Sequence, residues 1–344
     1  MQTKIIKPLI IIGLLLMLTI IGLGGGLFYK IHSHAFVIMD KQIVYVDERK
    51  NYADVITQLQ TVGKLKDKQF FHFLSEKMKY PQNMKTGRYE ITPGMSYLEV
   101  VRMLRGGHQT PIQLTFNNIR LKKDLAECIA RQLIFPADTL LDRLNNPQIT
   151  TALGFDTTTI VALFIPNTYE IYWNTSVDKF LERMKKEYDH FWTPERLKKA
   201  QNQRLTPIQV SILASIVEEE SNLKQEYPII AGLYLNRLKK GMLLQACPTV
   251  KYAFGDFTLK RILHEHTQVD SPYNTYKYFG FPPGPIRIPS IPAINGVLNA
   301  TKHDYIFMCA KENFSGSHYF SVTLSEHNRH ALQYQVELNR NHIR

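Results

Sequence analysis

The amino-acid sequence predicts an α+β protein with an N-terminal transmembrane helix, a small α+β module and a larger mixed α+β domain. Three observations support this fold class. An uncharged apolar run occupies residues 9–29. Short β-branched and aromatic runs alternate with amphipathic helical stretches between residues 42 and 204. From residue 205 onward, capped apolar helices alternate with loops rich in tyrosine, asparagine and proline. A chain of 344 residues is long enough for two or more packed domains.

The composition is typical of globular proteins, and the sequence argues against a sequence-specific nucleic-acid-binding protein. Hydrophobic residues make up 44% and charged residues 21%, close to globular averages. The net charge of +12 would attract an anionic partner, but the basic residues are scattered in small groups. No recognition helix, zinc-finger spacing or aromatic RNA-binding motif accompanies them. The three cysteines share no short spacing, so no disulfide framework, redox motif or metal site is expected from them.

The run at residues 9–29 is predicted to span a membrane. Its 21 residues carry no charge, and about 20 residues of helix are needed to cross the hydrocarbon core. A cleaved signal peptide is the alternative, but the A-x-A pattern of a cleavage site is missing. Lys4 and Lys7 precede the run, so the short tail at residues 1–8 is expected in the cytoplasm and the remainder outside.

Residues 42–112 are predicted to form the small module. Alternating and amphipathic patterns identify its strands and helices, and Ser96 with Glu99 has the spacing of a capping box. The expected elements, in order, are a strand at 43–46, helices at 52–61 and 68–77, a strand at 88–91 and a helix beginning at Ser96.

Residues 113–204 are predicted to form an intermediate α+β segment. Leu125, Ile129 and Leu133 recur at helical spacing, which indicates one helix that contains all three. The expected elements, in order, are a strand at 112–116, this helix, an aromatic extended stretch at 162–173 and a charged, exposed helix at 177–190.

Residues 205–344 are expected to form the domain that contains the catalytic site. Thr206, Pro207 and Gln209 are typical of a helix start with a capping box. The helix ends in three glutamates, and at 100° per residue Glu220 falls near the centre of the apolar face. On the same wheel Glu219 lies about 90° from that face and Glu218 about 170° from it.

Glu220 is therefore the carboxyl group most suited to be a general acid. Burial favours the neutral form of a carboxyl group and raises its pKa toward the range useful near neutral pH. The alternative is a frayed helix end with three solvated glutamates. Glu218 and Glu219 are expected to be solvated, and the other possibility is that they shift the pKa of Glu220 by like-charge repulsion. A second helix, YPIIAGLYLNRLKKG, follows and is expected to pair with the first, with Glu220 at the mouth of the pair. The loops beyond it offer aromatic rings and amides of the kind that bind sugar polymers.

Five segments in order, SILASIVEEES, IIAGLYLNRLKKGMLLQ, CPTVKYAFG, SPYNTY and GFPPGPI, resemble the YceG-like family of endolytic murein transglycosylases of the bacterial cell envelope. The resemblance implies a lytic-transglycosylase catalytic domain at 205–344 and a LysM-like, peptidoglycan-binding module at 42–112. It also implies a single-pass inner-membrane protein with an extracytoplasmic domain, peptidoglycan glycan strands as substrate, and a peptidoglycan synthase as a candidate partner.

The implied reaction cuts the MurNAc–GlcNAc β-1,4 bond of nascent strands and leaves a 1,6-anhydro-MurNAc end, without cofactor or metal. The catalytic glutamate of the family matches Glu220, with Glu218 as the runner-up. Gln245, Tyr273, Asn274 and Tyr276 are the expected substrate-binding residues. Two positions depart from the family pattern: Cys247 replaces an aspartate, and Ile288, Pro289 and Ser290 replace Asn-Pro-Gly.

Three other functions fit parts of the sequence. A membrane-anchored peptidoglycan-binding protein without catalysis would use the glutamates only as a helix end. A hydrolytic muramidase would use water as the nucleophile. A metalloenzyme is suggested by His264, Glu265 and His266, but adjacent residues do not share one helical face as the histidines of a metal-binding helix do.

Overall fold

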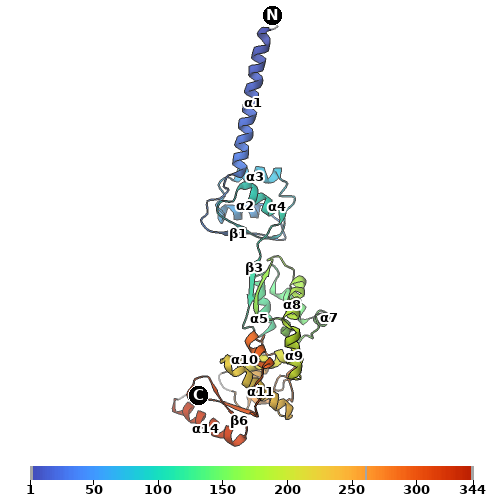
Figure 1. Cartoon of the computed structure of the whole chain (residues 1–344), viewed down its shortest axis with the longest axis vertical. Coiled ribbons are helices and arrows are strands. Elements are labelled where there is room, and N and C mark those ends of the chain that lie inside the picture. The colour runs from blue at the N-terminus through green and yellow to red at the C-terminus, as the bar shows by residue number, and fades with distance from the viewer. Residues whose placement is uncertain (1–2, 260–261, 342–344) are drawn as a thin grey trace. The chain divides into compact units, whose positions relative to one another are not determined.

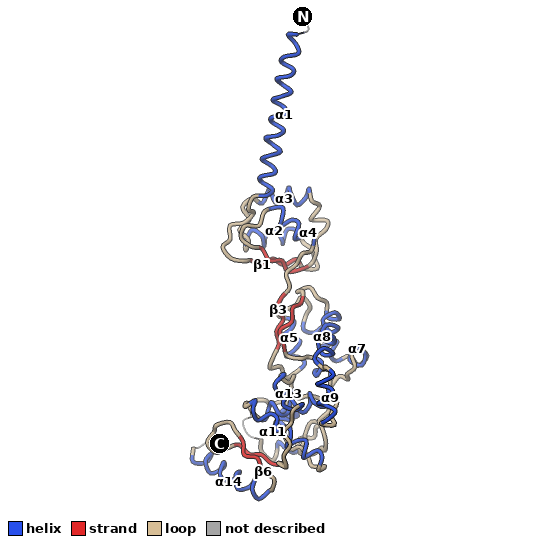
Figure 2. Tube along the Cα trace, in the orientation of Figure 1, coloured by secondary structure: helices blue, strands red, loops and turns tan. Residues whose placement is uncertain are grey.

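The computed structural model describes residues 3–259 and 262–341, and the chain divides into two compact units (Figure 1). Unit 1 combines Met1–Gln113 with Glu170–Thr175, and unit 2 combines Leu114–Tyr169 with Ser176–Arg344. Strands occur only as three short two-stranded sheets within the described residues, and helices supply most of the regular structure (Figure 2). The predicted α+β class is confirmed.

The N-terminal helix α1 (Thr3–His32) is longer than the apolar run that predicts it. Its segment Ile11–His32 has a mean hydropathy of 2.4, and none of its most apolar 18-residue stretch is buried in the protein. The helix is therefore long and apolar enough to cross a membrane. It continues to His32 because Lys30 and His32 suit the negative end of the helix dipole.

The remainder of unit 1 has the elements predicted for residues 42–112. Strands β1 and β2 pair antiparallel, with Val44 opposite Tyr89. The capping box at Ser96 and Glu99 is present, and Gly107 ends α4 with a left-handed φ of 74°. Buried side chains from every element form one core. The elements are β1 (Gln42–Val46), α2 (Tyr52–Thr61), α3 (Lys68–Lys77), β2 (Gly87–Ile91) and α4 (Tyr97–Gly106).

Three predictions for the next segment need correction. The helix expected to be exposed at 177–190 buries one face, formed by Val177, Phe180, Leu181, Met184 and Tyr188. The helix α5 ends at Ala130, so Leu133 lies beyond it, although its side chain is still buried. The stretch at 162–173 is not continuously extended, because Ala162 and Leu163 belong to a 3-10 turn before Pro166. The elements are β3 (Ile112–Phe116), α5 (Lys122–Ala130), α6 (Ala137–Asn145), α7 (Pro147–Ala152), η1 (Ile160–Leu163), β4 (Asn167–Ile171), α8 (Val177–Phe191) and α9 (Pro194–Asn202).

The rest of unit 2 is built around the helix α10 (Pro207–Glu220). Helices α11, α12 and α13 all pack against it, and α13 also packs against α11. Gly296 permits this close approach, since a Cβ there would lie 2.6 Å from the Cβ of Tyr227. The remaining elements are η2 (Lys224–Glu226), α11 (Tyr227–Lys239), α12 (Cys247–Phe254), η3 (His266–Gln268), α13 (Ile291–Leu298), β5 (Phe307–Ala310), β6 (His318–Ser321) and α14 (Leu324–Arg340).

The helix α10 lacks the single apolar face expected from its sequence. Every residue from Val210 to Val217 is buried. Neighbouring helices cover one side, and the loop that includes Ile286 covers another, where the Ser215 hydroxyl accepts a hydrogen bond from the Ile286 amide at 3.0 Å. The capping box predicted at Thr206 and Gln209 is present. Since α10 is central, its last residues are held by tertiary contacts and do not fray.

Candidate active site

The three consecutive glutamates have three different environments. Glu218 accepts a hydrogen bond from the Ser290 amide at 2.8 Å. Glu219 binds the guanidinium groups of Arg120 at 2.7 Å and Arg287 at 2.6 Å. Glu220 accepts a hydrogen bond from the Tyr234 hydroxyl at 2.6 Å. The expectation that Glu218 and Glu219 are solvated is therefore wrong.

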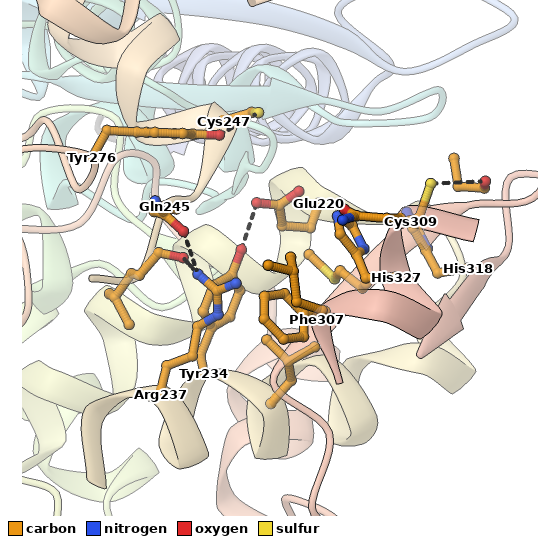
Figure 3. Close-up of a pocket in the computed structure, with 16 residues that line it drawn as sticks. Glu220, Tyr234, Arg237, Gln245, Cys247, Tyr276, Phe307, Cys309, His318 and His327 are labelled. Atoms are coloured by element: carbon orange, nitrogen blue, oxygen red, sulfur yellow. Dashed lines mark hydrogen bonds between the residues drawn. The ribbon is translucent and has the colours of Figure 1, made fainter. Parts of the chain in front are cut away.

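The helical period explains why Glu218 and Glu219 share one side of α10. Residues separated by three or four positions are neighbours on a helix, so Ser215, Glu218 and Glu219 form one continuous edge. The loop at 286–290 lies along this edge and bonds to all three side chains. Glu220 points elsewhere, toward α11, and is the glutamate that lines a pocket (Figure 3).

The pocket has a volume of about 450 Å³, within the usual range for small-molecule sites. Figure 3 shows Glu220 at its centre, with Tyr234 below it and His318 and His327 to its right. Among the residues that line this pocket in the described part of the chain, Glu220 is the one carboxylic acid. The lining residues are Glu220, Leu233, Tyr234, Arg237, Leu244, Gln245, Cys247, Tyr276, Phe307, Met308, Cys309, Ala310, His318, Leu324, His327 and Asn328.

The environment of Glu220 raises the pKa of its carboxyl group above 4.5. Burial is the main cause, and the charge of Glu219 adds to it. The hydrogen bond from Tyr234 and the positive charges of His318 and Lys251 act in the opposite direction without cancelling it. The residue keeps partial exposure, so a ligand in the pocket can reach a carboxylic acid whose pKa is raised.

Tyr234 and Arg237 give the pocket a rigid wall. Arg237 is buried and donates to the carbonyl oxygens of Ile306, Leu243 and Leu244 at 2.6, 3.1 and 3.0 Å. These contacts tie α11 to the loop before α12 and to the start of β5. The Tyr234 hydroxyl, one turn earlier on α11, is thereby fixed against Glu220.

Two of the four predicted substrate-binding residues line the pocket. Gln245 has a left-handed φ of 52°, and its side-chain oxygen accepts a hydrogen bond from Arg237 at 3.1 Å. The Tyr276 hydroxyl lies 3.2 Å from the Cys247 sulfur. Burial raises the pKa of the Cys247 thiol, and the charge of Glu220 raises it further. Cys247 is thus a neutral thiol at a position where the resemblance to the family leads us to expect an aspartate.

The other two predicted residues do not line the pocket. Asn274 is fully buried, and its amide nitrogen donates to the carbonyl oxygens of Thr267 and Val269 at 2.9 and 2.7 Å. Its side-chain oxygen accepts from the Tyr276 amide at 3.0 Å, so it holds the loop that carries Tyr276. Tyr273 packs on the ring of Tyr252, with the centroids 4.7 Å apart.

Sequence reasoning missed the residues that reach the pocket from distant segments. Tyr234 follows Leu233 in the apolar helical segment YPIIAGLYLNRLKKG, and a tyrosine hydroxyl on a buried helical face usually has a polar partner. Phe307, His318 and His327 come from β5, β6 and α14, about a hundred residues after Glu220, and no local pattern links them to it.

The suggested metal site at His264, Glu265 and His266 is not assembled. The His266 ring nitrogen Nδ1 accepts a hydrogen bond from the Leu263 amide at 2.9 Å. Within residues 3–259 and 262–341, no three histidine, cysteine, aspartate or glutamate side chains are grouped as metal ligands.

We expect Tyr234→Phe to change the pH dependence of any reaction in which Glu220 gives up a proton. The tyrosine hydroxyl stabilises the carboxylate, so its loss raises the pKa of Glu220. The alkaline limb of the pH–rate profile should move to higher pH, and the rate at neutral pH should fall about tenfold, the value of one hydrogen bond to a charged group. An unchanged limb would contradict this assignment.

The fold and the site define a class: an α+β protein with an apolar N-terminal helix and a pocket whose lining, among the described residues, combines one carboxylic acid with aromatic and amide side chains. The YceG-like family matches residues 44–333, and the chain belongs to that family.

Relatives and solved structures agree with this assignment. An endolytic murein transglycosylase of Bacillus subtilis is 28% identical over 75% of this chain and 75% of its own length. One from Streptococcus pneumoniae is 24% identical over 94% of this chain, which spans 65% of the length of that relative. The crystal structure of a YceG-like protein from Listeria monocytogenes superposes with a TM-score of 0.55 and 26% identity, covering 84% of this chain and 98% of the other.

Proposed function

We propose that this chain cuts the β-1,4 bond between MurNAc and GlcNAc inside nascent glycan strands, closes a 1,6-anhydro ring on the MurNAc end and so terminates elongation. The broader class follows from the family and from the names of its relatives: the chain is a lytic murein transglycosylase. Peptidoglycan is accordingly its substrate.

The proposal assigns both proton transfers to Glu220. The protonated carboxyl group donates its proton to the glycosidic oxygen while the bond from that oxygen to C1 of MurNAc breaks. The C6 hydroxyl oxygen of the same sugar then bonds to C1, and its proton passes to the Glu220 carboxylate. Glu220 ends as it began, protonated, and no water is consumed. A raised pKa suits the first transfer, since the acid must hold its proton near neutral pH.

One observation favours the lytic transglycosylase reaction over hydrolysis. Glycoside hydrolases of the usual kinds place two carboxyl groups across the scissile bond. The described residues that line the pocket include one carboxylic acid, and Cys247 is a neutral thiol. A single carboxyl group is sufficient when the nucleophile is a hydroxyl of the substrate itself.

Pocket residues supply candidate contacts to the sugars. Tyr276 and Phe307 offer aromatic faces for sugar rings, and Gln245 offers an amide. We assign Asn274 a positioning role, because it holds the Tyr276 loop and is fully buried. The module at 42–112 is proposed to bind peptidoglycan in the manner of a LysM domain, and a peptidoglycan synthase remains a candidate partner. The apolar helix is proposed to anchor the protein with its N-terminus in the cytoplasm and both units outside.

Mass spectrometry of the products tests the proposed reaction. Purified glycan strands digested with the full-length protein should yield fragments that end in 1,6-anhydro-MurNAc. A muramidase would leave a reducing MurNAc end, which is heavier by one water, and that product would overturn the proposal. A parallel digestion with a strong chelator tests the metalloenzyme alternative, and activity should be retained.

A further inference from the structure

Beside Glu220 lies a second buried carboxylate, Glu226, which the proposed reaction does not use. It is 7% exposed and accepts three hydrogen bonds at 2.8 Å. They come from the Ser221 hydroxyl, the His318 backbone amide and the His318 ring nitrogen Nδ1. Ser221 directly follows Glu220, so Glu226 joins the end of α10 to strand β6.

The charge state of Glu226 determines how His318 is protonated. Burial alone would raise the pKa of Glu226, but the hydrogen bonds from His318 and Ser221 outweigh it and hold this pKa below its usual value. An ionised carboxylate only accepts hydrogen bonds, so Nδ1 of His318 must carry a proton. The second ring nitrogen, Nε2, is then the atom available on a ring that lines the pocket with Glu220.

The two pocket histidines are not equivalent. The His327 ring stacks on Phe307, with centroids 5.3 Å apart, and burial lowers the pKa of His327, with the charge of Arg237 acting in the same direction. The lowered pKa favours the neutral form of His327, whereas the His318 ring is hydrogen-bonded to the Glu226 carboxylate and its charge lowers the pKa of Glu220. Of the two imidazoles, His318 is the one that can bring a positive charge to the pocket.

We propose that His318, held by Glu226, is the positioning residue that allows Glu220 to change from acid to base. This inference rests on the proposed function. When Glu220 gives its proton to the glycosidic oxygen, a carboxylate forms in a partly desolvated pocket. The positive charge of the His318 ring, which lowers the pKa of Glu220, stabilises that carboxylate until the C6 hydroxyl attacks C1 and its proton returns to Glu220.

Other groups around Glu220 do not replace this role. Tyr234 is a neutral donor, and the Arg237 guanidinium is occupied by carbonyl oxygens and Gln245. The charge of Lys251 also lowers the pKa of Glu220, but Lys251 does not line the pocket, whereas His318 does. The titratable and charged groups that face Glu220 are Tyr234 and Arg237 on α11, Cys247 and Lys251 on α12, Tyr276 on its loop, His318 on β6, His327 on α14 and Glu219 on α10 itself.

His318→Gln tests the inference in the full-length protein. We expect the rate at neutral pH to fall about 10- to 100-fold, in the range of one electrostatic contact to the reacting group. The positive charge of His318 lowers the pKa of Glu220, so its removal should move the alkaline limb of the pH–rate profile to higher pH. A lower rate with an unmoved limb in a folded variant, or an unchanged rate, would overturn the inference.

Glu226→Gln provides a second variant that keeps the side-chain volume but removes the anion that holds the ring. It should lower the rate and move the alkaline limb of the pH–rate profile to higher pH, as His318→Gln does. A variant that carries both substitutions should be no slower than the slower of the two single variants. Additive losses would mean that the two residues act independently and would overturn the pairing. Exposed His190 supplies the matched control, since His190→Gln changes a histidine outside the pocket.

The outcomes separate this inference from the proposed function. If the wild-type protein releases no anhydro ends, the proposed reaction is wrong and the role of His318 falls with it. If wild type releases anhydro ends and Glu220→Gln does not, while His318→Gln retains the wild-type rate and pH profile, only the role of His318 is wrong.

Discussion

Glu220→Gln is expected to lower the release of anhydro-muropeptides by about 10²- to 10⁴-fold, the usual contribution of general acid–base catalysis. Glutamine has the shape of glutamate, and its side-chain oxygen can still accept the hydrogen bond from Tyr234. The change therefore removes the proton donor and leaves the pocket in place. The measurement is the initial rate of anhydro-end formation from purified glycan strands.

Glu218→Gln is the informative comparison for this experiment. Glu218 is bonded to the Ser290 amide and does not line the pocket, so its loss should reduce the rate by less than about tenfold. A larger loss in Glu218→Gln than in Glu220→Gln would assign the acid to the runner-up instead.

The same Glu220 variant should be more stable than wild type at neutral pH. Because burial raises the pKa of Glu220 in the folded protein above 4.5, the folded state favours the neutral form. Below about pH 4 the group is protonated in both the folded and unfolded states, and it has no differential effect. As the pH rises through the folded pKa, the folded protein must hold a buried carboxylate and loses stability. The melting-temperature gain of Glu220→Gln should therefore grow between pH 4 and pH 8, and a constant difference would contradict the raised pKa.

Glu219→Ala is expected to have a large effect on stability. Its carboxylate binds Arg120, and it also binds Arg287, whose side chain is 12% exposed. Among the described residues, removing the glutamate leaves the largely buried Arg287 guanidinium with only Asn118 at 2.6 Å and the more distant Glu218 at 3.7 Å as partners. We expect a loss of about 2–3 kcal/mol in the free energy of unfolding, below the 3–5 kcal/mol typical of a fully buried pair. Urea unfolding of the purified protein measures this change.

Glu182→Ala is the control for that measurement. Glu182 lies on an exposed position of α8 and makes no ion pair among the described residues. Its replacement should change the unfolding free energy by less than about 0.5 kcal/mol. Equal effects of the two substitutions would mean that the arginine contacts of Glu219 add nothing to stability.

Local sequence patterns predicted most of the secondary structure because the signals were themselves local. The helices α2 and α3 have the predicted bounds, and the capping boxes at Ser96 and Thr206 lie where their spacing indicated. Capping depends on the geometry of four consecutive residues, which a sequence contains in full. The errors at Leu133 and at 162–163 are errors of boundary and local geometry, where tertiary packing overrides a regular pattern.

The sequence alone singled out the glutamate cluster, the apolar N-terminal helix and the likeness to the YceG-like family. The helical wheel also separated Glu220 from its neighbours, but for an incomplete reason, since α10 is covered on more than one side. Only the tertiary structure decided what each glutamate contacts: the Ser290 amide, two arginines and a tyrosine on another helix. Those partners are between 14 and 99 residues away along the chain, and so are the strands that carry the rest of the pocket. The protonation of a carboxyl group depends on the atoms packed around it, and that packing exists only once distant segments have come together.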